Sequence, residues 1–275
     1  MISFPNCKIN LGLNITAKRT DGFHELTTFF YPLALRDCLE IIPASDSLFS
    51  FSASGIVIPS DGSKNICEKA YDLLHFQYNL PAIKMHLHKS IPIGAGLGGG
   101  SSDGAYTLTL LNSLFELNIT QQELKTMAAT LGSDCAFFID NKPAIARGRG
   151  EQLSPFPLQL KGSYLALIMP PIHVSTAEAY AGILPRQPEH EIRKILSGPV
   201  NSWKDLLVND FESHIFEKYP RIAAIREELY AMGAVYASMS GSGAAVYGIF
   251  SSEISGKTLN GIFHDCFVWA ETLKI

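Results

Sequence analysis

The chain has 275 residues, enough for one large domain or two modest ones, and 47% of them are hydrophobic, so it can bury a substantial core. Its formal net charge of −4 argues against a nucleic-acid-binding protein, because such proteins concentrate Lys and Arg. The sequence shows neither a signal segment nor a long apolar run, and its five cysteines include no C-x-x-C pair. These features predict a cytoplasmic protein with reduced thiols and no membrane or nucleic-acid partner.

The first predicted element is a strand over residues 7–17, where apolar and polar residues alternate to give one buried face and one polar face. Lys8 and Asn10 share the polar face, about 7 Å apart along the strand. An Asp-Gly pair at positions 21–22 precedes a second β-rich run, residues 23–33. This arrangement predicts a hairpin.

The middle of the chain mixes strand and helix patterns. The elements predicted there are strands at residues 38–42, 56–58 and 83–89 and a helix at residues 66–76. From Ser101 onward, apolar residues recur every three to four positions, which predicts another helix. A T-x-x-E capping box at Thr120 begins a further helix, and Gly132 ends it.

Residues 142–157 are rich in Gly, Pro and charge, which predicts a boundary between domains at residues 1–155 and 156–275. The elements predicted beyond it are a strand at 164–169, helices at 202–216 and 221–232, and strands at 234–239 and 244–250 around a Ser-Gly-Ser-Gly turn. Runs of strands followed by runs of helices predict an α+β fold.

The most informative segment is PIGAGLGGGSS, residues 92–102, between a predicted strand and a predicted helix. Its five glycines allow positive φ angles and a close approach of the backbone to a ligand. The helix that follows presents unpaired N–H groups and about half a positive charge at its start. A flexible linker or a tight turn is the alternative, but a linker would not join a strong strand to a strong helix. The segment therefore predicts a phosphate-binding loop.

Two other nucleotide-binding motifs share part of this pattern. Gly94, Gly96 and Gly99 satisfy G-x-G-x-x-G, but a second helix follows the first, so the βαβ unit of a dinucleotide-binding fold is missing. A Walker A loop needs Gly-Lys-Ser/Thr, and no Lys occurs between Gly94 and Ser102. The H-R-D and D-F-G motifs of protein kinases are also absent from the sequence.

Five segments resemble the GHMP kinase superfamily. Residues 92–102 match its second motif, P-x-x-x-G-L-G-S/G-S-S/G, and SMSGSGAAVYGIF resembles its third. NCKINLGLNI, KRTDGFHEL and LGSDCAFF resemble blocks of the branch that phosphorylates a cytidine-diphosphate-linked methylerythritol in non-mevalonate isoprenoid biosynthesis. The resemblance implies a two-domain GHMP kinase fold, with an N-terminal ribosomal-protein-S5-like α/β domain and a C-terminal α/β-plait-like domain.

The resemblance also implies phosphoryl transfer from ATP to the 2-hydroxyl of that substrate, with Lys8 and Asp134 as the catalytic pair. A carboxylate can accept the hydroxyl proton, and a nearby Lys can keep the carboxylate ionised. Without the resemblance, Lys8 is an ordinary solvated strand residue, and Asp134 complements a helix dipole. The expected cofactors are ATP and Mg²⁺. No acidic residue stands out as a metal ligand, so phosphates, or phosphates with a loop serine, would hold the ion.

Further binding roles follow from the same resemblance. The expected ATP-binding residues are Pro92, Ile93, Gly94, Ala95, Gly96, Leu97, Gly98, Gly99, Gly100, Ser101, Ser102, Asn65 and Lys89. The expected substrate-binding residues are Asn10, Phe23, His24, Thr176, Tyr180, Gly241 and Ser242. Phe23 and Tyr180 would stack on the cytosine, worth roughly 1–3 kcal/mol for each aromatic. Packing beside the hairpin turn and in the core are the alternatives for these two rings.

Some points stay open on sequence alone. A straight hairpin would separate Lys8 from His24 by roughly 30 Å, more than the substrate can span, so we expect this strand to bend or bulge. His86 and His88 share one strand face, but an exposed polar face explains them better than a metal pair. Another GHMP kinase for a different small alcohol, or a catalytically silent nucleotide-binding regulator, would fit the same fold. We expect a small-molecule substrate and a monomer or weak homodimer.

Overall fold

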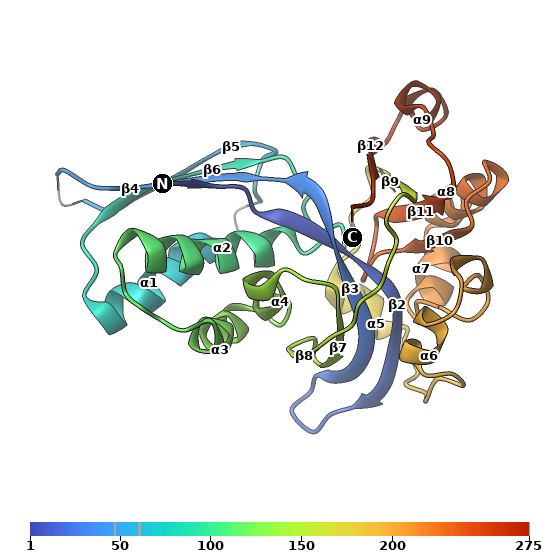
Figure 1. The fold of residues 1–275 in the computed structure, drawn as a ribbon, viewed down its shortest axis with the longest axis horizontal. Coiled ribbons are helices and arrows are strands. Elements are labelled where there is room, and N and C mark those ends of the chain that lie inside the picture. The colour runs from blue at the N-terminus through green and yellow to red at the C-terminus, as the bar shows by residue number, and fades with distance from the viewer. Residues whose placement is uncertain (47, 60–61, 275) are drawn as a thin grey trace. The chain divides into compact units, whose positions relative to one another are not determined.

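The computed structural model describes residues 1–46, 48–59 and 62–274, which form two compact units (Figure 1). The first unit consists of Met1–Lys8, Ala34–Ile93 and Gly98–Lys142. The second consists of Ile9–Leu33, Gly94–Leu97 and the chain from Pro143 onward. Both units are assembled from separate stretches of chain, so this division does not test two continuous domains at 1–155 and 156–275. That boundary stays a prediction.

The first unit is a four-stranded sheet with helices on one face. Its strand order is β1 (Ile2–Ser3), β4 (Cys38–Pro43), β6 (Ile83–Lys89) and β5 (Ser50–Gly55). β6 pairs antiparallel with β4 and parallel with β5. Its helices are α1 (Ile66–Tyr78), α2 (Gly99–Leu114), α3 (Gln121–Leu131) and α4 (Cys135–Asp140), of which α1 and α2 lie side by side beneath the sheet (Figure 1).

Local sequence signals set the ends of these helices. The Asn65 side chain accepts the Cys67 N–H at 2.9 Å, and Glu68 accepts the Asn65 N–H at 2.8 Å, so a capping box begins α1. The capping box predicted at Thr120 begins α3, and the predicted end at Gly132 is also confirmed. Among the described helices, none is long and apolar enough to span a membrane.

The second unit holds one four-stranded sheet completely and most of another, since the first residues of β2 (Asn6–Lys18) and the last residues of β3 (His24–Arg36) belong to the first unit. The sheet that includes these strands has the order β2, β3, β7 (Ala144–Gly148) and β8 (Gln152–Pro155). The other has the order β10 (Tyr236–Met239), β11 (Val246–Phe250), β9 (Tyr164–Met169) and β12 (Phe267–Thr272). Its helices are α5 (Thr176–Ala181), α6 (Ile192–Leu196), the 3₁₀ turn η1 (Val200–Ser202), α7 (Glu212–Lys218), α8 (Pro220–Ala231) and α9 (Gly256–Ile262).

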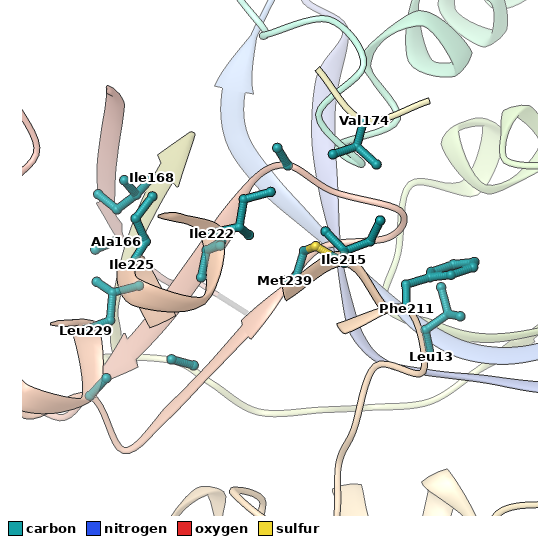
Figure 2. Packing of buried hydrophobic residues seen from close by; sticks show 14 of the residues in the cluster. Leu13, Ala166, Ile168, Val174, Phe211, Ile215, Ile222, Ile225, Leu229 and Met239 are labelled. Atoms are coloured by element: carbon teal, nitrogen blue, oxygen red, sulfur yellow. The ribbon is translucent and has the colours of Figure 1, made fainter. Parts of the chain in front are cut away.

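The core of the second unit joins α8 to the sheet of β9, β10 and β11 (Figure 2). Ile222, Ile225 and Leu229 recur every three to four residues, so they lie on one face of α8 and are fully buried. Ile168 and Met239, both from the sheet, belong to the same buried cluster (Figure 2). Burying these side chains stabilises the unit by about 1.5–3 kcal/mol for each residue.

The hairpin predicted at positions 21–22 is confirmed, and polar side chains of β2 are buried rather than solvated. Lys8, Asn10 and Asn14 are all buried, because each meets a polar partner. The Asn10 amide donates to Thr28 Oγ1 at 2.9 Å, and Asn14 donates to Asp210 at 3.4 Å. β2 is continuous over Asn6–Lys18, and within it Gly12 has a φ of +65°.

Two of the predicted elements are wrong. Residues 56–58 lie outside the sheet, and the strand is β5, whose short alternation contains only one large apolar side chain, Phe51. The helix predicted at 202–216 is reduced to η1 and α7. Between these, the Asp210 N–H donates to Leu13 O at 2.8 Å, and the Leu13 N–H donates to Val208 O at 2.9 Å. Pairing with β2 therefore replaces helical hydrogen bonds in this segment.

The buried face of α8 generates a stability prediction. Ile225→Ala should lower the free energy of unfolding by about 2–5 kcal/mol, because it removes three carbon atoms from a packed site. Leu184 lies in the same unit and is 89% exposed, so Leu184→Ala, which also removes three carbons, should change stability by less than about 0.5 kcal/mol. Chemical denaturation of both variants measures the difference. Equal effects would show that α8 does not anchor this core.

Candidate active site

Lys8 and Asp134, the two predicted catalytic residues, form an ion pair within the first unit. Lys8 Nζ lies 3.3 Å from Asp134 Oδ2, and the Lys8 side chain is 3% exposed while that of Asp134 is 28% exposed. A buried ammonium needs a nearby carboxylate to offset the loss of water. Asp134 precedes α4 at the N-cap position without capping it, so its carboxylate is not committed to that helix. The geometry leaves this carboxylate accessible and beside a cation.

Glycines shape the loop between β6 and α2. Gly94, Gly96 and Gly98 have φ angles of +66°, +73° and +68°, values that side chains rarely tolerate. A Cβ at Gly98 would lie 3.0 Å from Lys8 Cε. The absence of a side chain at Gly98 therefore lets the start of α2 approach the lysine of the ion pair.

The start of α2 offers donors for an anion. Its N-cap is Gly98, which has no side chain to cap the helix, and the first helical hydrogen bond runs from Ser102 N to Gly98 O at 2.9 Å. The N–H groups of residues 99–101 therefore precede the helical ladder. Ser102 Oγ is buried and has no hydrogen-bond partner within the described part of the chain. A buried hydroxyl without an acceptor is unfavourable, so Ser102 Oγ is suited to donate a hydrogen bond to a phosphate oxygen.

The described residues contain no group of three or more His, Cys, Asp or Glu side chains that could hold a metal ion. His86 and His88 instead contact serines. Ser54 Oγ lies 2.8 Å from His86 Nε2 and 3.0 Å from His88 Nδ1.

In the second unit, residues 94–97 pack against the turn that joins β10 to β11. Ser240 Oγ donates to Gly96 O at 2.9 Å and accepts the Asn10 N–H at 3.2 Å. The Ala245 N–H donates to Ala95 O at 3.2 Å. The sequence selected Gly241 and Ser242 in this turn, whereas the hydroxyl that bonds to the loop belongs to Ser240. Ser240 and Ser242 are each followed by a glycine, so the sequence does not indicate which of the two hydroxyls bonds to the loop.

Asn209 holds this turn from the other side and was missed by sequence reasoning. Its amide nitrogen donates to Met239 O and Gly241 O, both at 2.8 Å, and its oxygen accepts the Phe211 N–H at 3.0 Å. The side chain is buried. The sequence placed Asn209 inside a helix, where an Asn has no special role.

Aromatic side chains gather elsewhere in the second unit. The rings of His24 and Tyr180 stack with centroids 4.6 Å apart, and Phe211 meets Tyr180 edge-on. Burial, and secondarily the charge of Lys18, lowers the pKa of His24, so its ring is mostly neutral at neutral pH. Phe23 is 53% exposed, and the Arg149 guanidinium lies 4.8 Å from its ring centre. Neutral imidazole and aromatic faces suit a nucleobase.

The remaining predicted residues have structural partners. Thr176 is exposed at the start of α5, the helix that carries Tyr180. The Asn65 side chain caps α1. Lys89 is buried between Asp37 and Asp103, with Nζ donating at 2.7 Å to Asp103 Oδ2. Contact of Asn65 or Lys89 with a nucleotide stays a prediction.

The loop geometry generates a second stability prediction. A Cβ at Gly96 would lie 1.9 Å from Ser240 O, a backbone atom, so Gly96→Ala should cost about 2 kcal/mol or more through steric clash and strain at positive φ. A Cβ at Gly100 would meet no other group within 4 Å, so Gly100→Ala should leave stability equal or higher. Thermal unfolding compares them. A harmless Gly96→Ala would show that the loop does not pack on the turn.

Comparisons with known proteins agree with this geometry. The profile described as GHMP kinases N terminal domain matches residues 65–147, and the one described as GHMP kinases C terminal matches residues 192–259. The chain resembles the 4-diphosphocytidyl-2-C-methyl-D-erythritol kinase of Bacteroides thetaiotaomicron, with 53% identity over 92% of this chain and 93% of the relative. It resembles the same kinase of Parabacteroides distasonis, with 47% identity over 100% of both chains.

Solved structures give the same result. A crystal structure of 4-(cytidine 5'-diphospho)-2C-methyl-D-erythritol kinase matches with a TM-score of 0.83 and 31% identity, over 98% of each chain. The mevalonate kinase of Methanococcus jannaschii matches with a TM-score of 0.71 and 14% identity, over 100% of this chain and 98% of that one, which shows a shared fold. The predicted α+β GHMP kinase fold is therefore confirmed. The chain belongs to the GHMP kinase family, among the 4-diphosphocytidyl-2-C-methyl-D-erythritol kinases.

Proposed function

We propose that this protein transfers a phosphoryl group from ATP to the 2-hydroxyl of 4-diphosphocytidyl-2-C-methyl-D-erythritol. The observation that carries the proposal is the Lys8–Asp134 ion pair, next to Gly98 at the start of α2. Groups that can bind phosphate and a group that can accept a proton thus lie in one unit. The names of the relatives supply the choice of substrate.

Asp134 and Lys8 have complementary roles in this proposal. Asp134 orients the acceptor hydroxyl and takes its proton as the new O–P bond forms. Lys8, 3.3 Å away, stabilises the negative charge that develops on the attacking oxygen. Because the transition state of phosphoryl transfer is loose, positioning by Asp134 contributes as well as proton removal.

The glycine loop binds the phosphates. The N–H groups at the start of α2 and the Ser102 hydroxyl donate to phosphate oxygens, and the helix dipole favours their negative charge. Mg²⁺, when bound with the nucleotide, neutralises phosphate charge. Residues 92–102 are thus proposed as the ATP-binding loop, with Asn65 and Lys89 assisting.

The second unit supplies the nucleoside-binding groups. His24 and Tyr180 bind the cytosine by hydrogen bonding and stacking, and Phe23 adds a second aromatic face. Asn10, Thr176, Gly241 and Ser242 complete the proposed set of substrate-binding residues. We also propose a cytoplasmic location and a monomer or weak homodimer, without nucleic-acid or membrane partners.

The decisive experiment for the function is ADP release by the purified protein with Mg²⁺-ATP and a panel of alcohols. The panel contains the cytidylyl substrate, mevalonate and homoserine, because kinases of the latter two share this fold. Turnover of the cytidylyl substrate alone supports the proposal. Turnover of another alcohol instead would identify a different GHMP kinase, and no turnover with intact ATP binding would identify a silent regulator.

The catalytic pair generates a kinetic prediction. Asp134→Asn should lower kcat by about 10²–10⁴-fold, because an amide cannot accept the proton. Asp140→Asn is the matched control. Asp140 ends α4, the helix that Asp134 precedes, it is 29% exposed, and it pairs with Lys125 at 2.9 Å. Its variant should retain near-normal kcat. A folded Asp134→Asn enzyme with normal kcat would remove Asp134 from the mechanism.

The stacked aromatics generate a prediction about binding. Tyr180→Leu keeps apolar contact with Phe211 but removes the ring, so KM for the cytidylyl substrate should rise about tenfold, as expected for about 1–3 kcal/mol of lost stacking. KM for ATP should not change. Tyr180→Phe keeps the ring and should stay near wild type. Steady-state kinetics with each substrate varied in turn measures both KM values. An unchanged KM for the cytidylyl substrate in the Tyr180→Leu variant would place the cytosine elsewhere.

A further inference from the structure

A buried cluster of three charged side chains joins the end of β6 to α2 in the first unit. Lys89, the last residue of β6, donates to Asp37 and, at 2.7 Å, to Asp103 Oδ2. The three side chains are each no more than 3% exposed. Buried charge is costly unless every member is paired, so an ammonium between two carboxylates is a specific arrangement rather than a chance contact.

Asp37 connects the cluster to the backbone that enters the loop. Its Oδ1 accepts the N–H groups of Ser90 at 2.6 Å and Ile91 at 2.9 Å, the two residues directly before Pro92. Its own N–H donates to Pro5 O at 2.8 Å, which fixes Asp37 in the link between β3 and β4. The carboxylate therefore holds the loop entrance through three donors, one of them the Lys89 ammonium.

Asp103 connects the same cluster to the loop exit. It lies within α2, four residues after the helix begins at Gly99. The two ends of the loop also approach closely, since a Cβ at Gly99 would lie 2.9 Å from Ile91 Cγ2 and 3.5 Å from Lys89 Nζ. Lys89 thus bridges the carboxylate that holds the entrance and the carboxylate that belongs to the exit.

The charge balance shows how tightly Lys89 is held. Burial alone would lower the pKa of Lys89, but attraction to Asp103 and Asp37 reverses this and raises it, so the ammonium stays charged. Burial, with the charge of Asp37 added and that of Lys89 opposing, raises the pKa of Asp103. A cation that is 3% exposed and shared by two carboxylates is poorly available for an external anion.

We propose that Lys89, Asp37 and Asp103 form a positioning group that fixes the entrance and exit of the glycine loop, so that Lys89 supports ATP binding through the loop backbone rather than by contact with the nucleotide. This inference rests on the proposed function, because it assigns ATP to the loop. Backbone donors bind an anion well only when their directions are fixed before binding. The cluster supplies that fixation at both ends of the loop.

The test separates positioning from direct contact by compensating for the lost charge. Lys89→Met leaves two buried carboxylates without their cation, so the loop should shift and the Kd for ATP should rise about tenfold or more. In Lys89→Met/Asp103→Asn, the amide of the new asparagine can donate to Asp37. The double variant should recover ATP affinity to within a few-fold of wild type, although it still lacks the lysine.

The control is another lysine of the same strand. Lys84 of β6 pairs with Asp46 at 2.9 Å but is 42% exposed, so Lys84→Met should leave ATP affinity unchanged. In steady-state kinetics, the Lys89→Met variant should raise KM for ATP more than it lowers kcat, and should leave KM for the cytidylyl substrate unchanged. A generally destabilised protein would not show this selectivity for one substrate.

The outcomes are distinct. If the double variant regains thermal stability but keeps the full loss of ATP affinity, Lys89 contacts the nucleotide and the inference is overturned. Normal affinity in folded Lys89→Met also overturns it. If Lys89→Met does not fold, the ATP affinity of the double variant alone tests the inference, with the same two outcomes. Calorimetry with ATP and no alcohol measures this affinity, so failure of the wild type to phosphorylate the cytidylyl substrate would refute the proposed function without deciding the role of Lys89.

Discussion

Two lysine ammonium groups are buried in the first unit, and each is held there by carboxylate oxygens. Lys8 meets Asp134, and Lys89 meets Asp37 and Asp103. The two sites differ in what the carboxylate can still do. Asp134 keeps more than a quarter of its side chain exposed, whereas Asp37 and Asp103 are enclosed. This difference in exposure supports the two proposed roles, in which the first pair takes part in the reaction and the second cluster fixes the loop backbone.

Close contacts between the loop backbone and neighbouring groups explain where glycine is required. At Gly96 and Gly98 a side chain would meet the Ser240 carbonyl and Lys8 Cε respectively, and both residues also have positive φ. At Gly100 there is open space. The glycine-rich composition thus overstates the number of required glycines. Only the positions where another group lies within contact distance determine the shape of the loop.

Much of this architecture could be predicted from the sequence, because the relevant signals are local or periodic. The hairpin at 21–22, the capping box at Thr120 and the strand over residues 83–89 each follow from a few neighbouring residues, and the structure confirms them. The loop and its family followed from motifs of similar length. The pairing of Lys8 with Asp134 required the resemblance, since 126 positions separate them and neither has a distinctive neighbourhood.

The residues that sequence reasoning missed share one physical property: their side chains bind backbone groups far away in the chain. Asn209 holds the carbonyls of residues 239 and 241, and Asp37 holds the N–H groups of residues 90 and 91. Such bonds create no periodicity, because they depend on tertiary proximity rather than on spacing. They also explain the wrong helix at 202–216, where Asn209 and Asp210 satisfy backbone of other segments instead of continuing a helical ladder. In the sequence, a side chain that binds distant backbone is therefore indicated locally only as a short polar residue that interrupts an apolar pattern. Asp37, which lies between two β-rich runs, is such a residue.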